Sequence, residues 1–334
     1  MSSLPSPSAA SGDALSLLHA PVGGSLKLNV PMLPLTRVLC ALDVERSARA
    51  PLAHASSLSQ QLRLPLDGLY VTPPLGGWED RLGRVRRLIA EHNARERLDA
   101  LLAPFASLLD VNSFVTRGAS SDVIGAHAAQ HCAELIVIGG ARQRATAGAT
   151  QLASRLSAAA ERGVLTVPGD SPSCALRTIL LPVTARTPES PALAWVTMLA
   201  RSFGASVELV AVEPMSLGFW RSLTRRSPLA GELQDDVLHA LRVIEQSLSA
   251  AGITTIGASA PVPAAEIESR VEAAEWDMVA VGLPASVASP EAVLLERLRK
   301  NGTTPVLSIR ASKRLAAVAT LRRLDDECEL SASA

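Results

Sequence analysis

The sequence predicts an α/β protein made of two tandem, doubly wound open sheets, each of about five parallel strands flanked by helices. Two observations indicate this class. Short apolar runs rich in β-branched residues alternate with longer segments of helical periodicity. The same series of runs then recurs later in the chain, as expected for a duplicated domain.

The repeat is visible in four pairs of strand-like runs. TRVLCALD begins at Thr36 and RTILLPVT at Arg177, an offset of 141 residues. Three further pairs of equivalent residues have offsets of 141, 143 and 142: Val71 and Val212, Gly139 and Gly282, Val164 and Val306. Agreement among four runs indicates a tandem duplication, and the two halves are called the first and second copy below.

The elements of the first copy follow in order. Strands are predicted near 37–42, 67–72, 112–117, 134–139 and 164–167, and helices over 47–64, 80–109 and 120–133. The third helix is expected to start on a serine cap and to turn Val123, Ile124 and Ala128 inward. Continuously apolar strands are buried on both faces, which indicates a parallel sheet between helices, wound with right-handed crossovers.

The predicted domains are residues 36–169 and 176–311, joined by a linker at 170–175 within the Pro/Gly/Ser-rich run PGDSPSCA. Residues 1–34 are rich in Ser, Pro, Ala and Gly and are expected to be disordered. The tail, 312–334, is expected to form at most one amphipathic helix.

Bulk composition excludes several classes of protein. The 334 residues carry 32 basic and 32 acidic side chains, so no net field recruits nucleic acid or an anionic membrane. No apolar run is long enough to span a bilayer. The four cysteines are far apart, without metal-type spacing, and are expected to be reduced and mostly buried in a cytoplasmic protein.

Three runs of the first copy, taken together, resemble the universal stress protein family in its two-domain form, over residues 36–311. VLCALD ends in Asp43, SFVTRGASSDVI places Gly118 between a strand and a helix, and ELIVIGG ends a fourth strand. The resemblance implies an adenine-nucleotide alpha-hydrolase-like fold. It also implies ATP lying across the carboxyl ends of the strands, over a phosphate loop of the form G-x2-G-x9-G-[S/T].

Carried onto this sequence, the resemblance implies seven nucleotide-binding positions: Asp43, Val71, Gly139, Gly140, Arg142, Gly148 and Thr150. The loop departs from the pattern because Arg142 stands where the second glycine is expected. Gly148 and Thr150 represent the third glycine and its hydroxyl partner, with Ser154 after Ala153 as an alternative. Arg142 and Arg144 either contact phosphate oxygens or are solvated, and the solvated interpretation is favoured.

The second copy has lost more of the pattern. Thr184 replaces the aspartate, the run APVPAAEI lacks a glycine, and the loop keeps only Gly282. Pro284 and Pro290 remove or stiffen the backbone groups that would surround a phosphate. The expected cofactor is therefore at most ATP with Mg²⁺, bound weakly or not at all, and confined to the first copy.

Other constellations favour structural interpretations. His127 and His131 lie four residues apart beside Cys132, but no carboxylate lies at a telling distance in the sequence, so no metal site is predicted. No serine hydrolase elbow is present around Ser120. Trp78 and Trp220 are expected to pack under equivalent loops, and the basic run 221–226 to be solvated.

The leading hypothesis is a non-catalytic stress-response or regulatory protein. An ATP-hydrolysing or adenylyl-handling enzyme and a purely structural interaction module stay open as alternatives. The enzyme lacks a positioned base, a metal-binding carboxylate pair and a P-loop lysine. The expected partners are a second protein or another copy of the chain, and an adenine nucleotide, without nucleic acid or membrane.

Overall fold

The structure is a computed structural model. It describes residues 35–44, 48–73, 81–140, 147–159, 162–169, 171, 175–212, 228–257, 261–273, 276–284, 289–301 and 303–310. Several predictions fall outside these residues: the 1–34 segment, the 312–334 tail, most of the linker, Trp78, Trp220 and the run 221–226.

Ten strands form one continuous sheet in the order β3-β2-β1-β4-β5-β10-β9-β6-β7-β8. The strands are β1 (Val38–Ala41), β2 (Leu66–Thr72), β3 (Val111–Arg117), β4 (Leu135–Gly139), β5 (Gly163–Val167), β6 (Thr178–Val183), β7 (Ser206–Ala211), β8 (Thr255–Gly257), β9 (Met278–Leu283) and β10 (Val306–Arg310). Neighbouring strands within each copy are parallel, and β5 pairs with β10 antiparallel. The predicted fold class is confirmed, with the two sheets joined edge to edge.

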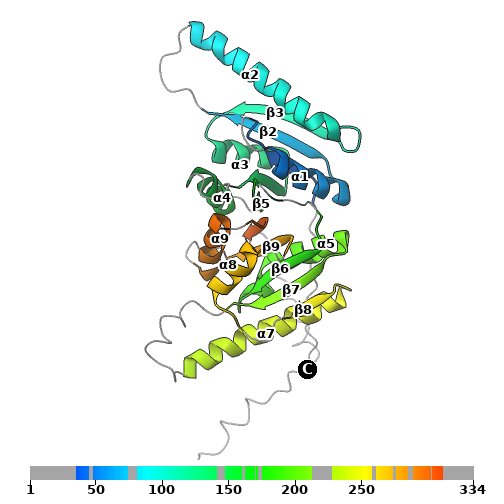
Figure 1. Cartoon of the computed structure of the whole chain (residues 1–334), viewed down its shortest axis with the longest axis vertical. Coiled ribbons are helices and arrows are strands. Elements are labelled where there is room, and N and C mark those ends of the chain that lie inside the picture. Colours follow the sequence, from blue (N-terminus) through cyan, green and yellow to red (C-terminus); the bar gives the residue numbers. More distant parts are fainter. Residues whose placement is uncertain are drawn as a thin grey trace, which may run out of the picture.

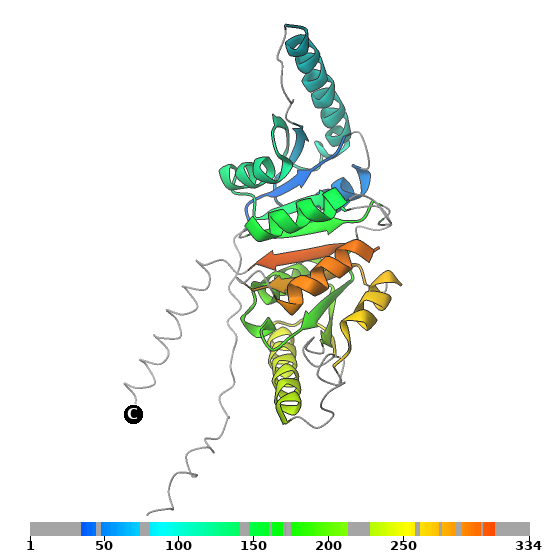
Figure 2. The same cartoon turned by 90° about the vertical axis from the view of Figure 1, so that its left-hand side faces the viewer.

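The two copies have the same topology. The first copy has the order β3-β2-β1-β4-β5, and the second repeats it as β8-β7-β6-β9-β10. At the junction Leu165 faces Leu307, its equivalent at an offset of 142 residues. Antiparallel pairing of equivalent residues is what a pseudo-twofold axis between β5 and β10 requires. Figure 1 shows the first copy above this axis and the second below it, and Figure 2 shows β10 at the centre of the molecule.

Helices cover both faces of the sheet. The helices are α1 (Arg49–Leu62), α2 (Arg81–Leu102), α3 (Ser120–Gln130), α4 (Ala147–Ala159), α5 (Pro191–Phe203), α7 (Pro228–Ala250), α8 (Ala264–Glu272) and α9 (Pro290–Asn301). One apolar cluster runs under α1, α2, α5 and α7 through both copies. The opposite face carries two separate clusters, one under α3 and α4 and one under α8 and α9. The copies therefore share a core on one face only.

Most sequence predictions for the elements are confirmed. The five strands of the first copy begin and end within one residue of the predicted ranges. The predicted 80–109 helix is too long, because α2 ends at Leu102 and a short 3-10 turn with Pro104 follows. The serine cap of α3 is wrong: Ser120 is already the first helical residue, and Ala119 precedes it without a side-chain hydrogen bond.

In the part of the chain that the structure describes, no helix combines the length and apolar character needed to cross a membrane.

Candidate functional site

The strand order defines a crevice at the carboxyl ends of β1 and β4. The chain leaves β1 toward β2 on one side and later adds β4 on the other side. Such a reversal separates the loops that follow the two strands, which is where open parallel sheets bind ligands. Asp43 is exposed just after β1, and Gly139 is the last residue of β4. The structure therefore places these two predicted residues at adjacent strand ends.

Gly140 and Val71 also lie at this edge but have structural contacts. The Gly140 N–H donates to the carbonyl oxygen of Val167 at 2.6 Å, and a Cβ on Gly140 would lie 3.2 Å from that oxygen. Val71 is half-buried against the apolar cluster under α3. Both residues shape the edge of the sheet, and neither offers a polar side chain to a ligand.

Gly118 lies in the turn between β3 and α3, where only a glycine fits. Its φ angle is +147°, and a Cβ would lie 2.6 Å from Cγ2 of Val123. Its N–H donates to the carbonyl oxygen of Thr72 at 3.1 Å, at the carboxyl end of β2. The glycine thus keeps the entrance of α3 close to the strand ends.

The remaining predicted positions divide between α4 and the undescribed loop. Gly148 and Thr150 lie in the first turn of α4, and Arg142 and Arg144 lie outside the described residues. First-turn N–H groups have no intrahelical partner, so this turn can face an anion. The alternative partner, Ser154, is wrong for this role because its hydroxyl donates to Glu296 of α9.

The equivalent crevice of the second copy holds a protein carboxylate. Glu291, in the first turn of α9, is buried, and its Oε1 accepts a hydrogen bond from the Thr184 hydroxyl at 2.9 Å. Thr187 Oγ1 accepts the N–H of Thr184 at 2.8 Å. A carboxylate at the positive end of a helix occupies the place of an anionic ligand and would repel phosphate.

The backbone around this second crevice is also committed. The Ala292 N–H at the start of α9 donates to the Ser289 side chain at 3.2 Å, and Pro290 carries no N–H. A Cβ on Gly282 would lie 1.8 Å from the hydroxyl oxygen of Ser190, which caps α5. Gly282 therefore makes room for a helix cap, which gives a structural reason for the one glycine that this copy kept.

A second constellation lies at the opposite, amino-terminal end of the strands. Asp67, the second residue of β2, is fully buried beneath the end of α3. Its Oδ2 lies 3.9 Å from Nε2 of His127 and 3.8 Å from Nδ1 of His131. Both Asp67 Oδ2 and His127 Nε2 are buried without a hydrogen-bond partner among the described residues. The other carboxylate oxygen, Oδ1, is 2.6 Å from Arg37 and 3.1 Å from Asn112.

The two imidazoles are stacked and framed by an aromatic ring. Their centroids are 4.1 Å apart at 17°, and Phe114 meets both rings edge-on at 4.5 and 4.9 Å. Burial, with the neighbouring His131, lowers the pKa of His127 below its usual value. His127 is thereby kept neutral near pH 7, with a lone pair on one ring nitrogen.

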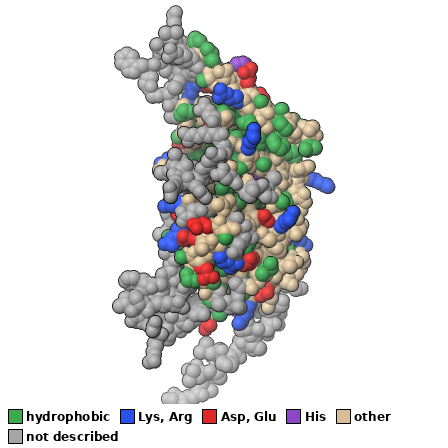
Figure 3. All heavy atoms as spheres, viewed as in Figure 1, with side chains coloured by type: hydrophobic (Ala, Val, Ile, Leu, Met, Phe, Trp, Pro, Cys, Tyr) green, Lys and Arg blue, Asp and Glu red, His purple; other side chains and the backbone are tan. Residues whose placement is uncertain are grey.

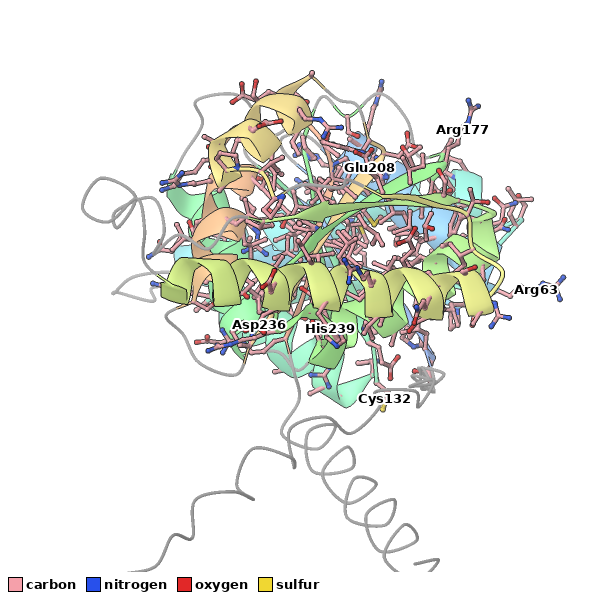
Figure 4. The ribbon with its side chains drawn as sticks, turned by 90° about the horizontal axis from the view of Figure 1, so that it is seen from below. Arg63, Cys132, Arg177, Glu208, Asp236 and His239 are labelled. Carbon is pink, nitrogen blue, oxygen red and sulfur yellow. The ribbon has the colours of Figure 1, made fainter. Side chains whose placement is uncertain are left out.

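The sequence argument missed Asp67 because it sought a carboxylate near the histidines along the chain. A signal was present, since Asp67 alternates with Leu69 and Val71 and so shares their inward face of β2. A charged residue at such a position is costly to bury and marks a site to inspect. Cys132 is exposed, contrary to the expectation of mostly buried cysteines, whereas Cys40 is buried (Figure 4).

The second copy treats its equivalent carboxylate differently. Glu208 stands at Asp67 plus 141, and both of its oxygens are paired (Figure 4). Arg270 donates to Oε1 at 2.8 Å and the Trp276 indole donates to Oε2 at 2.6 Å. The Arg270 guanidinium also lies 4.7 Å from the Trp276 ring centroid. Both copies therefore bury an acid here, and the second supplies protein donors to both oxygens.

The face drawn in Figure 3 shows basic and acidic side chains interspersed over the described surface, without a large field of one sign. This distribution agrees with the balanced composition and gives no support to nucleic-acid binding.

The architecture is that of the universal stress proteins. A universal stress protein from Archaeoglobus fulgidus matches with a TM-score of 0.57 at 11% sequence identity, covering 84% of this chain and 98% of that chain. A functionally unknown protein from Pseudomonas aeruginosa matches with a TM-score of 0.53 at 13% identity, covering 87% and 98%. No protein-family model and no curated protein matches the sequence. At these identities the likeness establishes the fold.

Proposed function

We propose that the chain is a regulatory protein of the universal stress type, acting without catalytic turnover and binding an adenine nucleotide weakly at the first copy alone. The observation that carries the proposal is the difference between the two crevices. The first has Gly118 and Gly139 at its strand ends and the first turn of α4 nearby. The second is filled by Glu291.

The weakness of binding is argued from the loop. A side chain at Arg142 replaces the glycine whose backbone would approach a phosphate. Gly140, the neighbouring glycine, gives its N–H to Val167. Fewer backbone donors then reach the phosphates, and the arginine offers one charge-assisted contact in their place.

Calorimetric titration of the full chain with ATP and Mg²⁺ tests the nucleotide. The full chain is needed because separated copies would expose the β5 or β10 edge, an aggregation hazard. We expect one weak site that Asp43→Ala removes and the matched Thr184→Ala leaves intact. Arg142→Ala should weaken binding by about 1.5–3 kcal/mol, the range for a charge-assisted contact.

A phosphate-release assay on the same samples tests the absence of turnover. Steady release of phosphate that Asp43→Ala abolishes would replace the proposal with an ATP-hydrolysing enzyme. No binding of ATP at millimolar concentration would leave a structural interaction module. A protein without turnover acts through its contacts, so the proposal includes a protein partner or self-association. The free thiols of Cys40 and Cys132 support a reducing compartment such as the cytoplasm.

A further inference from the structure

We propose that Asp67, His127 and His131 bind a divalent transition-metal ion, with Zn²⁺ as the committed ion, at the amino-terminal end of the first copy's strands. The site is separate from the proposed nucleotide crevice, which lies at the carboxyl ends of the same strands. The two proposals can therefore fail independently.

The geometry brings three ligand atoms to one point. One carboxylate oxygen and one nitrogen from each imidazole all lie within 4.8 Å of one another. Bonds of about 2.0–2.2 Å to a tetrahedral ion would hold such atoms roughly 3.4 Å apart. The 3.8 and 3.9 Å separations from Asp67 Oδ2 are close to that value. Side-chain adjustments of about half an ångström complete the site, with water in the fourth position.

Unsatisfied polar atoms point to a missing cation. Asp67 Oδ2 and His127 Nε2 face each other in the interior, and neither has a hydrogen-bond partner among the described residues. Leaving a buried carboxylate oxygen without a partner is costly. The second copy removes this cost with Arg270 and Trp276 on Glu208, and His127 stands where Arg270 would fall, at an offset of 143. In the first copy, a metal ion would supply the positive charge that Arg270 supplies in the second.

The surroundings suit a metal. Histidines four residues apart share one face of a helix, and they lie at the end of α3, where the helix dipole favours a cation. Arg37 and Asn112 hold the other oxygen of Asp67, which fixes the orientation of the carboxylate. His131 is 28% exposed, and it gives an ion access from solvent to the buried pair. Two imidazoles and one carboxylate are ligands typical of Zn²⁺ and similar ions.

Binding should disturb the stacked rings. A metal lies in the plane of the imidazole that binds it, whereas His127 and His131 now lie face to face at 4.1 Å. The rings must rotate out of the stack to share an ion. Their edge contacts with Phe114 should change with them. Ring-proton NMR signals of these three residues therefore provide a local readout.

The test is titration of the full chain, stripped with a chelator and free of nucleotide, with Zn²⁺ by calorimetry and with Co²⁺ by absorption spectroscopy. We expect one Zn²⁺ per chain, a visible Co²⁺ spectrum of low-coordinate type, and an increase in Tm with Zn²⁺. His131→Gln, at a partly exposed position, should lower affinity by at least about 100-fold and abolish the Tm increase. His127→Gln should do the same.

The matched control is His92→Gln. His92 lies on α2 with Glu96 one turn away at 3.2 Å, an exposed histidine–carboxylate pair that imitates adventitious surface binding. This variant should retain full Zn²⁺ affinity. The proposal is overturned if the chain binds no Zn²⁺ at up to millimolar concentration. It is also overturned if a correctly folded His131→Gln protein, judged by circular dichroism, binds with unchanged affinity and stoichiometry.

Discussion

Arg299 of α9 donates a hydrogen bond to the hydroxyl of Ser157 on α4 at 2.7 Å, and Ser157 is its own equivalent, 142 residues earlier. Ser154 and Glu296 form a second pair at the same offset. On the other face of the sheet, Gln61 donates to the carbonyl oxygen of Ser202, at an offset of 141. Equivalent positions thus meet across the pseudo-twofold axis with different side chains. The duplication has let each contact become asymmetric, which an identical pair of chains could not do.

Arg299→Met should leave stability nearly unchanged or raise it. The guanidinium is buried, and burial lowers its pKa to about 10, so it is still charged at neutral pH. Its NH2 group reaches Ser157 and Ser308, whereas Nε and NH1 have no hydrogen-bond partner among the described residues. Replacing a poorly paired buried ion with an apolar chain of similar length is often neutral or stabilising.

Ser157→Ala should act in the opposite direction and destabilise by about 1–2 kcal/mol, because it removes an acceptor from a buried cation. Urea unfolding of both variants, with m-values checked for equality, measures the two effects. A loss above about 3 kcal/mol in Arg299→Met would show that the guanidinium stabilises the junction.

Gly163→Ala should destabilise the contact between the copies. Gly163 begins β5, and a Cβ there would lie 2.9 Å from the Trp195 ring of α5 in the second copy. Trp195 is 3% exposed, so the ring has little room to move. Overpacking of this kind costs about 1–3 kcal/mol. Gly125→Ala is the control, since a Cβ there meets nothing within 4 Å on a helix. Equal thermal shifts for the two variants would contradict the interpretation.

Stability should fall as the pH decreases from 6.5 to about 4, and His54 should account for part of this. Burial lowers the pKa of His54 from 6.5 to about 4, partly offset by Asp277. The folded state keeps the ring neutral in this window, whereas the unfolded chain binds a proton, so protonation favours unfolding. The full effect is about 3 kcal/mol and is complete below pH 4.

His54→Gln can keep the 3.0 Å contact with Ser171 and removes the titration. Denaturant unfolding at half-unit pH steps should show a flatter profile for this variant between pH 6.5 and 4. Parallel profiles for the two proteins would assign the loss of stability to other groups.

The sequence predicts local features well and spatial ones less well. The first-copy strands fall within one residue of their predicted ranges because apolar runs bounded by Gly and Pro specify strand positions locally. The pairing of β5 with β10 depends on how two edges meet, which periodicity does not encode. Asp67 joins His127 across 60 residues, and only the parallel register of β2 under α3 brings them together. Glu291 was missed because the loop comparison examined glycines and prolines, whereas a buried acid is what fills the second crevice.

The last prediction concerns Thr184, which replaces the aspartate of the first copy. If Thr184 serves chiefly to satisfy Glu291, Thr184→Val should destabilise by about 1–3 kcal/mol, because it leaves one oxygen of a buried carboxylate without its donor. The other oxygen, Oε2, already has no partner among the described residues. Glu291→Gln keeps an acceptor for the Thr184 hydroxyl and should change stability by less than about 1 kcal/mol.

A double-mutant cycle with Glu291→Leu measures the coupling directly. In the Thr184→Val background, Glu291→Leu should recover part of the lost stability, because the carboxylate that needed a donor is gone. Thermal and urea unfolding of the four proteins gives the interaction energy. Strict additivity of the two substitutions would show that the Thr184–Glu291 hydrogen bond at 2.9 Å contributes nothing. The loss of the aspartate in the second copy would then need another explanation.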